Sequence, residues 1–130
     1  MPKGQCHCGA VQYEMPGETL HASLCHCSDC RRHSGAPVVA WGLVPKDQLH
    51  IDGETKKYAS SENGRRHFCP NCGTSLFYTN EVVFPNKVDV QFATLNEPSE
   101  IVPTTQIQVA ERIDWMERLD DIPQFQRFPV

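Results

Sequence analysis

The chain has 130 residues, of which 39% are hydrophobic and 22% are charged, and its formal net charge is −4. This length and composition suit a globular protein with an ordinary core, so we expect residues 1–130 to form a single domain. No run of basic residues exceeds two. Proteins that bind nucleic acid usually carry a clustered basic surface, so we expect no nucleic acid as a partner.

The beginning of the chain, MPKGQCHCGAVQYEM, contains one lysine and no apolar stretch, so it does not read as a secretory signal peptide. No window approaches the roughly 18 consecutive apolar residues that a membrane helix requires. We therefore expect a cytoplasmic protein without a membrane partner, in a compartment where thiols stay reduced. Its seven cysteines then need an explanation other than disulfides.

Short stretches with strand-like patterns follow one another along the chain. The stretch AVQYEM (10–15) alternates apolar and polar residues, and PVVAWGLV (37–44) is a more continuous apolar run that predicts a central strand. Further predicted strands are KKYAS (56–60), RRHFC (65–69), TSLFYT (74–79), VDVQFATL (88–95) and TQIQV (105–109). Turn signals such as Asp52-Gly53 separate them, and a spacing of about ten residues is typical of a mainly β fold.

Signals for helix are few. Near the C-terminus, Ile113, Met116 and Leu119 follow one another at intervals of three, which predicts one or two short helical turns. The alternative interpretation is that these side chains and Trp115 dock the tail onto the sheet. A proline at position 123 prevents a continuing helix.

The seven cysteines form three clusters, which are Cys6 and Cys8, then Cys25, Cys27 and Cys30, then Cys69 and Cys72. The last is a C-x-x-C followed by Gly73, which is typical of a zinc knuckle whose backbone N–H groups point at the sulfurs. A redox dithiol with the same spacing belongs in a βαβ setting, and no such pattern surrounds this one. We therefore predict a zinc ligand pair, which needs a second pair.

The pair Cys6-x-Cys8 can supply the other two zinc ligands. A disulfide between these two cysteines is not expected, because it would be strained between residues so close in the chain. A four-thiolate site made from the first and third clusters would hold the N-terminus against a distant strand. In the alternative partition, this pair joins two of the three middle cysteines and leaves a lone thiol. A four-plus-three division uses every cysteine, and a closed structural site takes four ligands.

Three thiolates from Cys25, Cys27 and Cys30 leave one position of a tetrahedral zinc open, unless His26 or His33 closes it. A sulfur-rich site favours a further soft ligand such as a substrate thiol, whose pKa the metal lowers. The expected chemistry is therefore the making or breaking of a carbon–sulfur bond. A non-catalytic zinc module that binds a thiol, a metal or a protein partner is the alternative.

The remaining basic side chains give weaker signals. Arg31 and Arg32 follow the middle cysteines directly and are candidates for binding a carboxylate of an anionic thiol substrate, or form a solvated basic corner. Arg65 and Arg66 lie on a predicted strand, where alternation lets only one of them share a face with a given site. By default we assign both of these to the surface.

Three stretches together resemble the glutathione-dependent formaldehyde-activating enzymes, which are grouped with centromere protein V. They are GQCHCGAVQYE, CHCSDCRRHSGAP and RRHFCPNCGTSLFY, in that order, and the later ATLNEP and RIDW resemble weaker signatures of the same family. Where family members often carry Asp and His, this chain has Asn96 and Gln106.

The resemblance implies a β-tent fold of stacked antiparallel sheets clamped by zinc. It implies two zinc ions per chain, one structural and one with an exchangeable position. The cysteines that match the structural site are Cys6, Cys8, Cys69 and Cys72, and those that match the second site are Cys25, Cys27 and Cys30. The implied activity is a carbon–sulfur lyase reaction of the S-(hydroxymethyl)glutathione synthase type, with glutathione or a similar small thiol as substrate.

Overall fold

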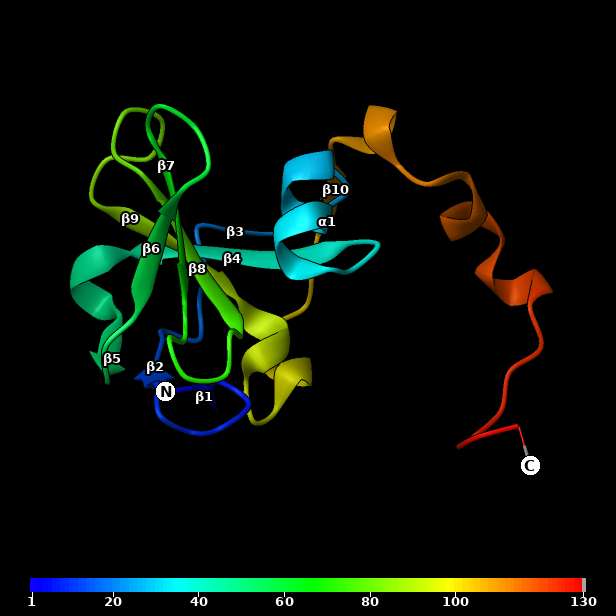
Figure 1. The fold of residues 1–130 in the computed structure, drawn as a ribbon, viewed down its shortest axis with the longest axis horizontal. Helices are drawn as coiled ribbons and strands as arrows, with labels where there is room; N and C mark the ends of the chain where they lie inside the picture. Colours follow the sequence, from blue (N-terminus) through cyan, green and yellow to red (C-terminus); the bar gives the residue numbers. More distant parts are fainter. Residues whose placement is uncertain (130) are drawn as a thin grey trace.

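A computed structural model describes residues 1–129, and Val130 lies outside the described part. Over these residues the strands form two sheets (Figure 1). The larger sheet has the strand order β10-β3-β4-β9-β8-β7-β6, and the smaller has the order β1-β2-β5. The predicted mainly β fold is confirmed.

The strands of the larger sheet are β3 (His21–Cys25), β4 (Val39–Pro45), β6 (Lys56–Ala59), β7 (Gly64–Phe68), β8 (Ser75–Asn80), β9 (Lys87–Gln91) and β10 (Thr105–Ile107). Those of the smaller sheet are β1 (Lys3–Gln5), β2 (Gln12–Glu14) and β5 (His50–Asp52). The one α-helix of the described residues is α1 (Ser28–Ser34). Single 3₁₀ turns cover Lys46–Gln48, Phe92–Thr94, Pro98–Glu100 and Val109–Glu111, and a longer 3₁₀ segment covers Asp114–Asp121.

Each strand expected from the sequence is present, and β4 lies inside the larger sheet as predicted, between β3 and β9. The predicted strand over 88–95 ends earlier, because the chain turns into a 3₁₀ segment at Phe92. The strands pair in antiparallel fashion, as expected, except at one edge, where β10 pairs with β3 in parallel. This pairing joins elements far apart in the chain, and an alternation pattern cannot reveal its direction.

No helix was predicted over residues 28–34, where α1 lies. Cys27 is its N-cap, and the Cys27 Sγ accepts a hydrogen bond from the backbone N–H of Cys30 at 3.3 Å. Gly35 ends the helix in the left-handed region, with φ of 64°. Ser, Thr, Asp and Asn are the usual cap residues, so a cysteine cap gives little sequence signal.

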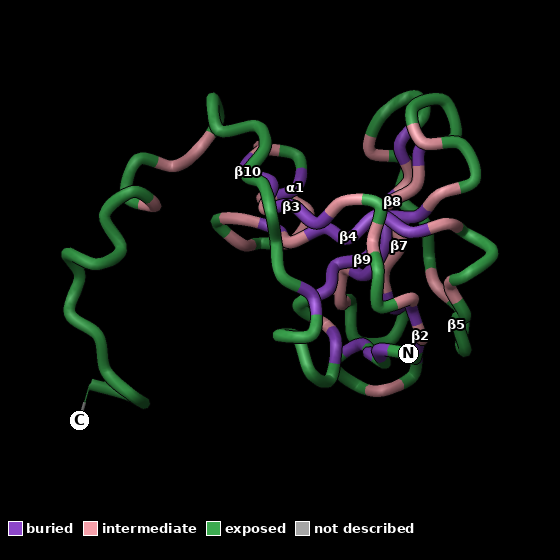
Figure 2. The backbone as a smooth tube through the Cα atoms, turned by 180° about the vertical axis from the view of Figure 1, so that it is seen from behind, coloured by how far each residue is buried: buried purple, intermediate pink, exposed green. Residues whose placement is uncertain are grey.

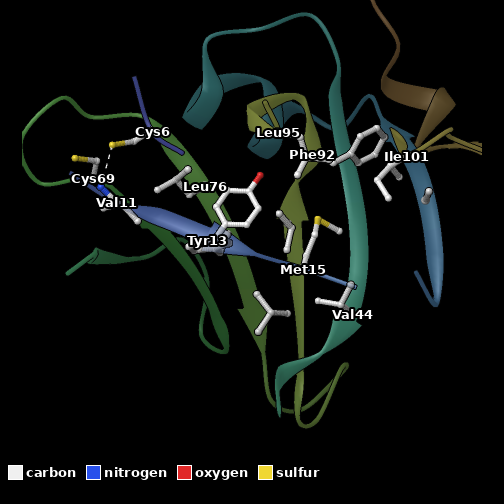
Figure 3. Close-up of a cluster of buried hydrophobic side chains, with 14 residues drawn as sticks. Cys6, Val11, Tyr13, Met15, Val44, Cys69, Leu76, Phe92, Leu95 and Ile101 are labelled. Carbon is white, nitrogen blue, oxygen red and sulfur yellow. Dashed lines mark hydrogen bonds between the residues drawn. The ribbon is translucent and has the colours of Figure 1, made fainter. Parts of the chain in front are cut away.

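The main core lies between the two sheets and contains the inward-facing residues of β2, β4, β8 and β9 (Figure 3). The ring of Tyr13 from β2 packs edge-on against Phe77 from β8, with their centroids 5.4 Å apart. Cys6 and Cys69 are also fully buried members of this core and lie beside Val11 in the figure. The four-cysteine region is therefore built into the main core.

The C-terminal tail leaves the body after β10 and runs away from both sheets as exposed chain (Figure 2). Helical turns are confirmed over Asp114–Asp121, in 3₁₀ form and interrupted at Arg118. Docking of the tail onto the sheet is wrong, because Trp115 is 46% exposed and Leu119 is 46% exposed. Within residues 1–129, no helix has the length and apolar character needed to cross a membrane.

Candidate metal centres and the adjoining cavity

The sulfurs of the first and third cysteine clusters of the sequence lie together in the structure. We call Cys6, Cys8, Cys69 and Cys72 the four-cysteine cluster, and their Sγ atoms all lie within 4.8 Å of one another. The Sγ atoms of Cys6 and Cys8 are 3.7 Å apart, and those of Cys8 and Cys69 are 3.8 Å apart. These separations are far longer than a disulfide bond of about 2.0 Å.

The cluster is formed by two similar turns. In one, Gly9 has φ of 82° and its N–H bonds to the Cys6 carbonyl at 3.2 Å. In the other, Gly73 also has φ of 82°, and its N–H bonds to the Cys69 carbonyl at 2.9 Å. Glycine adopts this left-handed conformation without a Cβ penalty. Both turns therefore end in a left-handed glycine that bonds back to the first cysteine, across three residues in the first turn and four in the second.

Backbone and side-chain N–H groups point at these sulfurs, as predicted for a knuckle. The N–H of Cys72 donates to the Cys69 Sγ at 3.4 Å, and that of Val11 donates to the Cys6 Sγ at 3.3 Å. The Asn71 side chain donates to the Cys8 Sγ at 3.3 Å. Such bonds stabilise thiolates, which are the metal-binding form of cysteine.

The donor set and spacing of the four-cysteine cluster fit zinc. Four sulfurs at about 2.3 Å from a tetrahedral zinc ion would lie about 3.8 Å from one another. The two sulfur separations given above match this value closely. The cluster could thus hold a metal ion.

The other three cysteines form a separate group, the three-cysteine cluster of Cys25, Cys27 and Cys30, whose sulfurs also lie within 4.8 Å of one another. Three different settings place them: the end of β3, the N-cap of α1 and the first full turn of that helix. The structure therefore divides the cysteines four plus three, and the alternative partition is wrong. All seven are free thiols.

Neither histidine considered as a closing ligand joins this cluster. The His26 Nε2 lies 2.8 Å from the Gln106 Oε1, and the His33 Nδ1 lies 3.0 Å from the Ser75 Oγ. Within the described residues, no histidine or carboxylate belongs to the group of ligand atoms around the three sulfurs. The cluster therefore offers three protein ligands to a metal ion.

The three-cysteine cluster lines a cavity of about 350 Å³, which we call the thiol cavity. Its wall is the face of the larger sheet opposite the main core. Each of five adjacent strands contributes a side chain, and these include Ser23 from β3, Trp41 from β4, Asp89 from β9, Tyr78 from β8 and Arg66 from β7. Val83 and Phe84 cover one side. This volume lies within the usual range of small-molecule sites.

Arg66 is the cationic side chain of the thiol cavity, and it is only 5% exposed. Its Nη1 donates to the Cys30 Sγ at 3.6 Å, and its guanidinium carbon lies 4.9 Å from the centre of the Tyr78 ring. No carboxylate pairs with it among the residues described. A buried charge needs a compensating charge, which thiolates of the three-cysteine cluster would supply. The surface assignment of Arg66 is therefore wrong.

Asp89 lies on β9 in the same cavity, is 6% exposed, and has no side-chain hydrogen bond to any other described residue. Burial raises the pKa of Asp89 to about 7, and the negative charge at Cys30 acts in the same direction. Hydrogen bonds from Cys25, Cys27, Trp41 and Arg66 lower the pKa of Cys30 to about 5. The cavity therefore favours a neutral carboxyl beside a thiolate.

Arg31 and Arg32, which the sequence suggested for substrate binding, do not line the thiol cavity. They line a shallower hollow together with Trp115 of the tail. The Arg31 Nε donates to the His26 carbonyl at 3.1 Å, so this side chain braces the backbone beside the cysteines. The sequence signal that was missed is the acidic Asp89 between two valines of an interior strand.

Comparison with known proteins identifies the chain's relatives. A family model described as "Glutathione-dependent formaldehyde-activating enzyme" matches residues 1–111. An uncharacterized lyase of Schizosaccharomyces pombe is 38% identical over 80 residues, covering 60% of this chain and 58% of the relative. A putative glutathione-dependent formaldehyde-activating enzyme of Aspergillus flavus is 30% identical over 104 residues, covering 74% and 54%.

Among solved structures, a crystal structure of a Rhodobacter sphaeroides protein is similar, with a TM-score of 0.60 and 28% identity. The match covers 80% of this chain and 98% of that protein. By contrast, the chain spans only about half the length of the two curated relatives above. The matched region 1–111 contains all seven cysteines and every residue named on the wall of the thiol cavity. This chain is a member of the glutathione-dependent formaldehyde-activating enzyme family.

Proposed function

We propose that this protein is a zinc-dependent enzyme of the carbon–sulfur lyase type, acting on the adduct of a small thiol with formaldehyde or a similar small aldehyde. The names of the relatives support glutathione as the thiol. The observation that carries the proposal is the three-cysteine cluster in the wall of a cavity, with no fourth ligand from the described chain.

We propose two zinc ions per chain. The four-cysteine cluster would hold one as a closed structural site, and the three-cysteine cluster would hold the other with a position free for an exogenous ligand. At the second site zinc would lower the pKa of a substrate thiol and hold it as the nucleophilic thiolate. A sulfur-rich ligand set suits such a soft ligand better than water.

The residues of the thiol cavity support this chemistry in three ways. Arg66 places a positive charge next to Cys30 and so offsets part of the negative charge of the thiolates. Trp41 and Tyr78 provide apolar wall that limits water near the reacting sulfur. Asp89 and Ser23 add polar groups to the wall of the same cavity.

Cobalt substitution tests the proposal, because thiolate-to-cobalt charge-transfer bands report on each sulfur ligand. Cobalt-loaded protein is titrated with glutathione and, separately, with S-methylglutathione, which has no free thiol. We expect glutathione to intensify the bands and S-methylglutathione to leave them unchanged. The variant Cys27→Ser, with one sulfur removed from the three-cysteine cluster, should lose the response.

The proposal would be abandoned if neither glutathione nor a simpler thiol such as 2-mercaptoethanol changed the bands. A closed second site, completed by a ligand from another protein, would give that result. The non-catalytic zinc module considered from the sequence would then be the better description.

A further inference from the structure

Three buried polar atoms without a hydrogen-bond partner in the described chain face the same cavity. They are the Ser23 Oγ, the Arg66 Nε and the Asp89 Oδ1, which are buried atoms of side chains that line the thiol cavity. Only one other buried side-chain atom in residues 1–129 is without a partner, the His26 Nδ1. Folded proteins satisfy nearly all such atoms, so three in one cavity point to a ligand that supplies the missing partners.

The sheet itself aims these groups at the cavity. Ser23 pairs with Trp41 across β3 and β4, and Asp89 pairs with Tyr78 across β8 and β9. Side chains of directly paired residues lie on the same face, so both polar groups belong to the wall that carries the three-cysteine cluster. Ser23 is only two residues before Cys25 on β3, and alternation places both on that face.

The three side chains differ in whether they already interact with another group. Arg66 is already engaged with the Cys30 sulfur and the Tyr78 ring. The hydroxyl of Ser23 and the carboxyl of Asp89 are uncommitted, because neither side chain has a hydrogen bond in the described structure. A neutral carboxyl and a hydroxyl can both donate to, and accept from, one small oxygen function.

We propose that Asp89 is a catalytic residue whose carboxyl hydrogen-bonds the oxygen of the aldehyde-derived carbon, and that Ser23 adds a second polar contact on the same wall. This inference rests on the proposed function and adds to it the group that moves the proton. The ligand class is a hemithioacetal, whose hydroxyl is small, uncharged and able both to donate and to accept.

The proton and electron changes balance as follows. In the synthetic direction, the substrate thiolate attacks the carbonyl carbon, the carbon–sulfur bond forms and the carbonyl π bond breaks. The oxygen takes the proton of the Asp89 carboxyl. In the reverse direction, the Asp89 carboxylate removes the hydroxyl proton, the carbonyl forms again and the carbon–sulfur bond breaks. The proton that the thiol lost on becoming a thiolate restores the acid form of Asp89 through solvent.

The variant Asp89→Asn tests the proton transfer, because the amide keeps the size of the carboxyl and cannot supply an acidic proton. Exchange between formaldehyde and its glutathione adduct is followed by NMR, with the spontaneous rate subtracted. General acid–base catalysis contributes typically 10²–10⁴-fold. We expect a loss of about 100-fold in kcat for this variant, and a loss of roughly tenfold for Ser23→Ala, which removes one hydrogen bond.

Binding of the thiol alone provides a second readout. The chain has two tryptophans, so in a Trp115→Phe background the cavity residue Trp41 is the sole tryptophan fluorophore. Glutathione binding without aldehyde should be the same within about twofold in the Asp89→Asn and Ser23→Ala variants. The exposed Asp47, far from the cavity on its 3₁₀ turn, gives the matched control Asp47→Asn, which should change neither readout.

The outcomes separate this inference from the proposed function. If the unmodified protein binds glutathione and catalyses exchange, but Asp89→Asn is within threefold of it, Asp89 is not the proton donor. If Asp89→Asn loses thiol binding in parallel with exchange, the carboxyl supports the site rather than the oxygen, and the inference again fails. If the unmodified protein neither binds thiol nor catalyses exchange, the proposed function fails first.

Discussion

The two cysteine clusters use the same ligand type in different settings. The four-cysteine cluster is formed by two tight turns, and two of its cysteines, Cys6 and Cys69, belong to the main hydrophobic core. The three-cysteine cluster lies on the other face of the larger sheet, beside a cavity with buried polar groups. The sulfurs of the four-cysteine cluster contact one another and accept hydrogen bonds from N–H donors. One side of the three-cysteine cluster opens onto the cavity.

This difference fits the proposed division, in which one cluster stabilises the fold and the other carries the chemistry. A site that must hold the fold benefits from a full ligand set inside the core, where removal of any ligand disturbs packing as well. A site that must exchange ligands needs an incomplete set and access from outside the core. The following predictions test that division, starting with the largest expected effect.

Removal of one sulfur from each cluster should have unequal consequences. Cys69→Ser should abolish cooperative folding at 25 °C, because structural zinc contributes on the order of 10 kcal/mol, comparable with the whole free energy of unfolding. Cys27→Ser should leave the protein folded, since serine is a preferred N-cap and α1 would keep its first hydrogen bond. Circular dichroism during thermal unfolding measures the difference, together with the zinc content of each variant.

Equal destabilisation by the two substitutions would contradict the division. Cys27→Ser should also retain one zinc per chain, and a folded Cys69→Ser protein with two zinc ions would be the opposite of this expectation.

The pH dependence of stability should identify the cavity carboxyl. The pKa of Asp89 rises from 3.8 to about 7 on folding, so its stabilising contribution is complete below pH 3.8 and is lost as pH rises towards 7. Asp89→Asn resembles the neutral acid at every pH. It should therefore raise the free energy of unfolding relative to the unmodified protein, by up to about 4 kcal/mol at pH 8.

This gain in the free energy of unfolding should shrink as pH falls from 8 to 5.5. Over this range the variant and the unmodified protein are compared with both metal clusters in the same state. Denaturant unfolding at several pH values provides the measurement. A gain that does not vary with pH would show that the carboxyl is already ionised throughout the range. The exposed control Asp47→Asn should give no pH-dependent difference.

The charge of Arg66 should matter at only one cluster. Arg66→Met keeps the length of the buried stem and removes the positive charge next to Cys30, so metal affinity of the three-cysteine cluster should fall about 10–100-fold. Arg65→Met changes the neighbouring residue on the opposite face of β7 and should leave the affinity unchanged. Competition with a chromogenic chelator measures both. A weaker four-cysteine cluster in Arg66→Met would argue for a general folding defect.

The smallest effects are expected at two glycines, one close to each cluster in the chain. Gly73 and Gly35 both have positive φ, and a Cβ at either position would meet no atom within 4 Å. Alanine there should cost only backbone strain, about 1 kcal/mol in each case. We expect Gly73→Ala to lower the unfolding midpoint, and Gly35→Ala to accelerate metal loss from the three-cysteine cluster, because Gly35 ends the helix that carries Cys30. Stopped-flow chelation distinguishes the two.

Residue types and spacing were enough to predict the strands and the division of the cysteines. Alternation identified β2 and β7, and a continuous apolar run identified the interior strand β4. The division followed from ligand arithmetic, since only four plus three uses every thiol. These features are local or depend on counting, so they can be read from a linear sequence.

Other features depended on contacts between distant residues. The parallel pairing of β10 with β3 and the projection of the tail away from both sheets have no local signature. The helix α1 was hidden because its cap is a cysteine. Arg31 and Arg32 were the obvious cations beside the cysteines, but the turn of α1 directs them to a different hollow.

By itself, then, the sequence determined which atoms can bind metal and how they divide into clusters, because thiol chemistry and ligand number belong to residue types. The tertiary structure alone decided what surrounds each site. Five neighbouring strands, distant in the chain, bring Ser23, Arg66 and Asp89 to one wall. The pairing of strands sets which face each side chain takes and which neighbours share it, and burial on that face raises the pKa of Asp89.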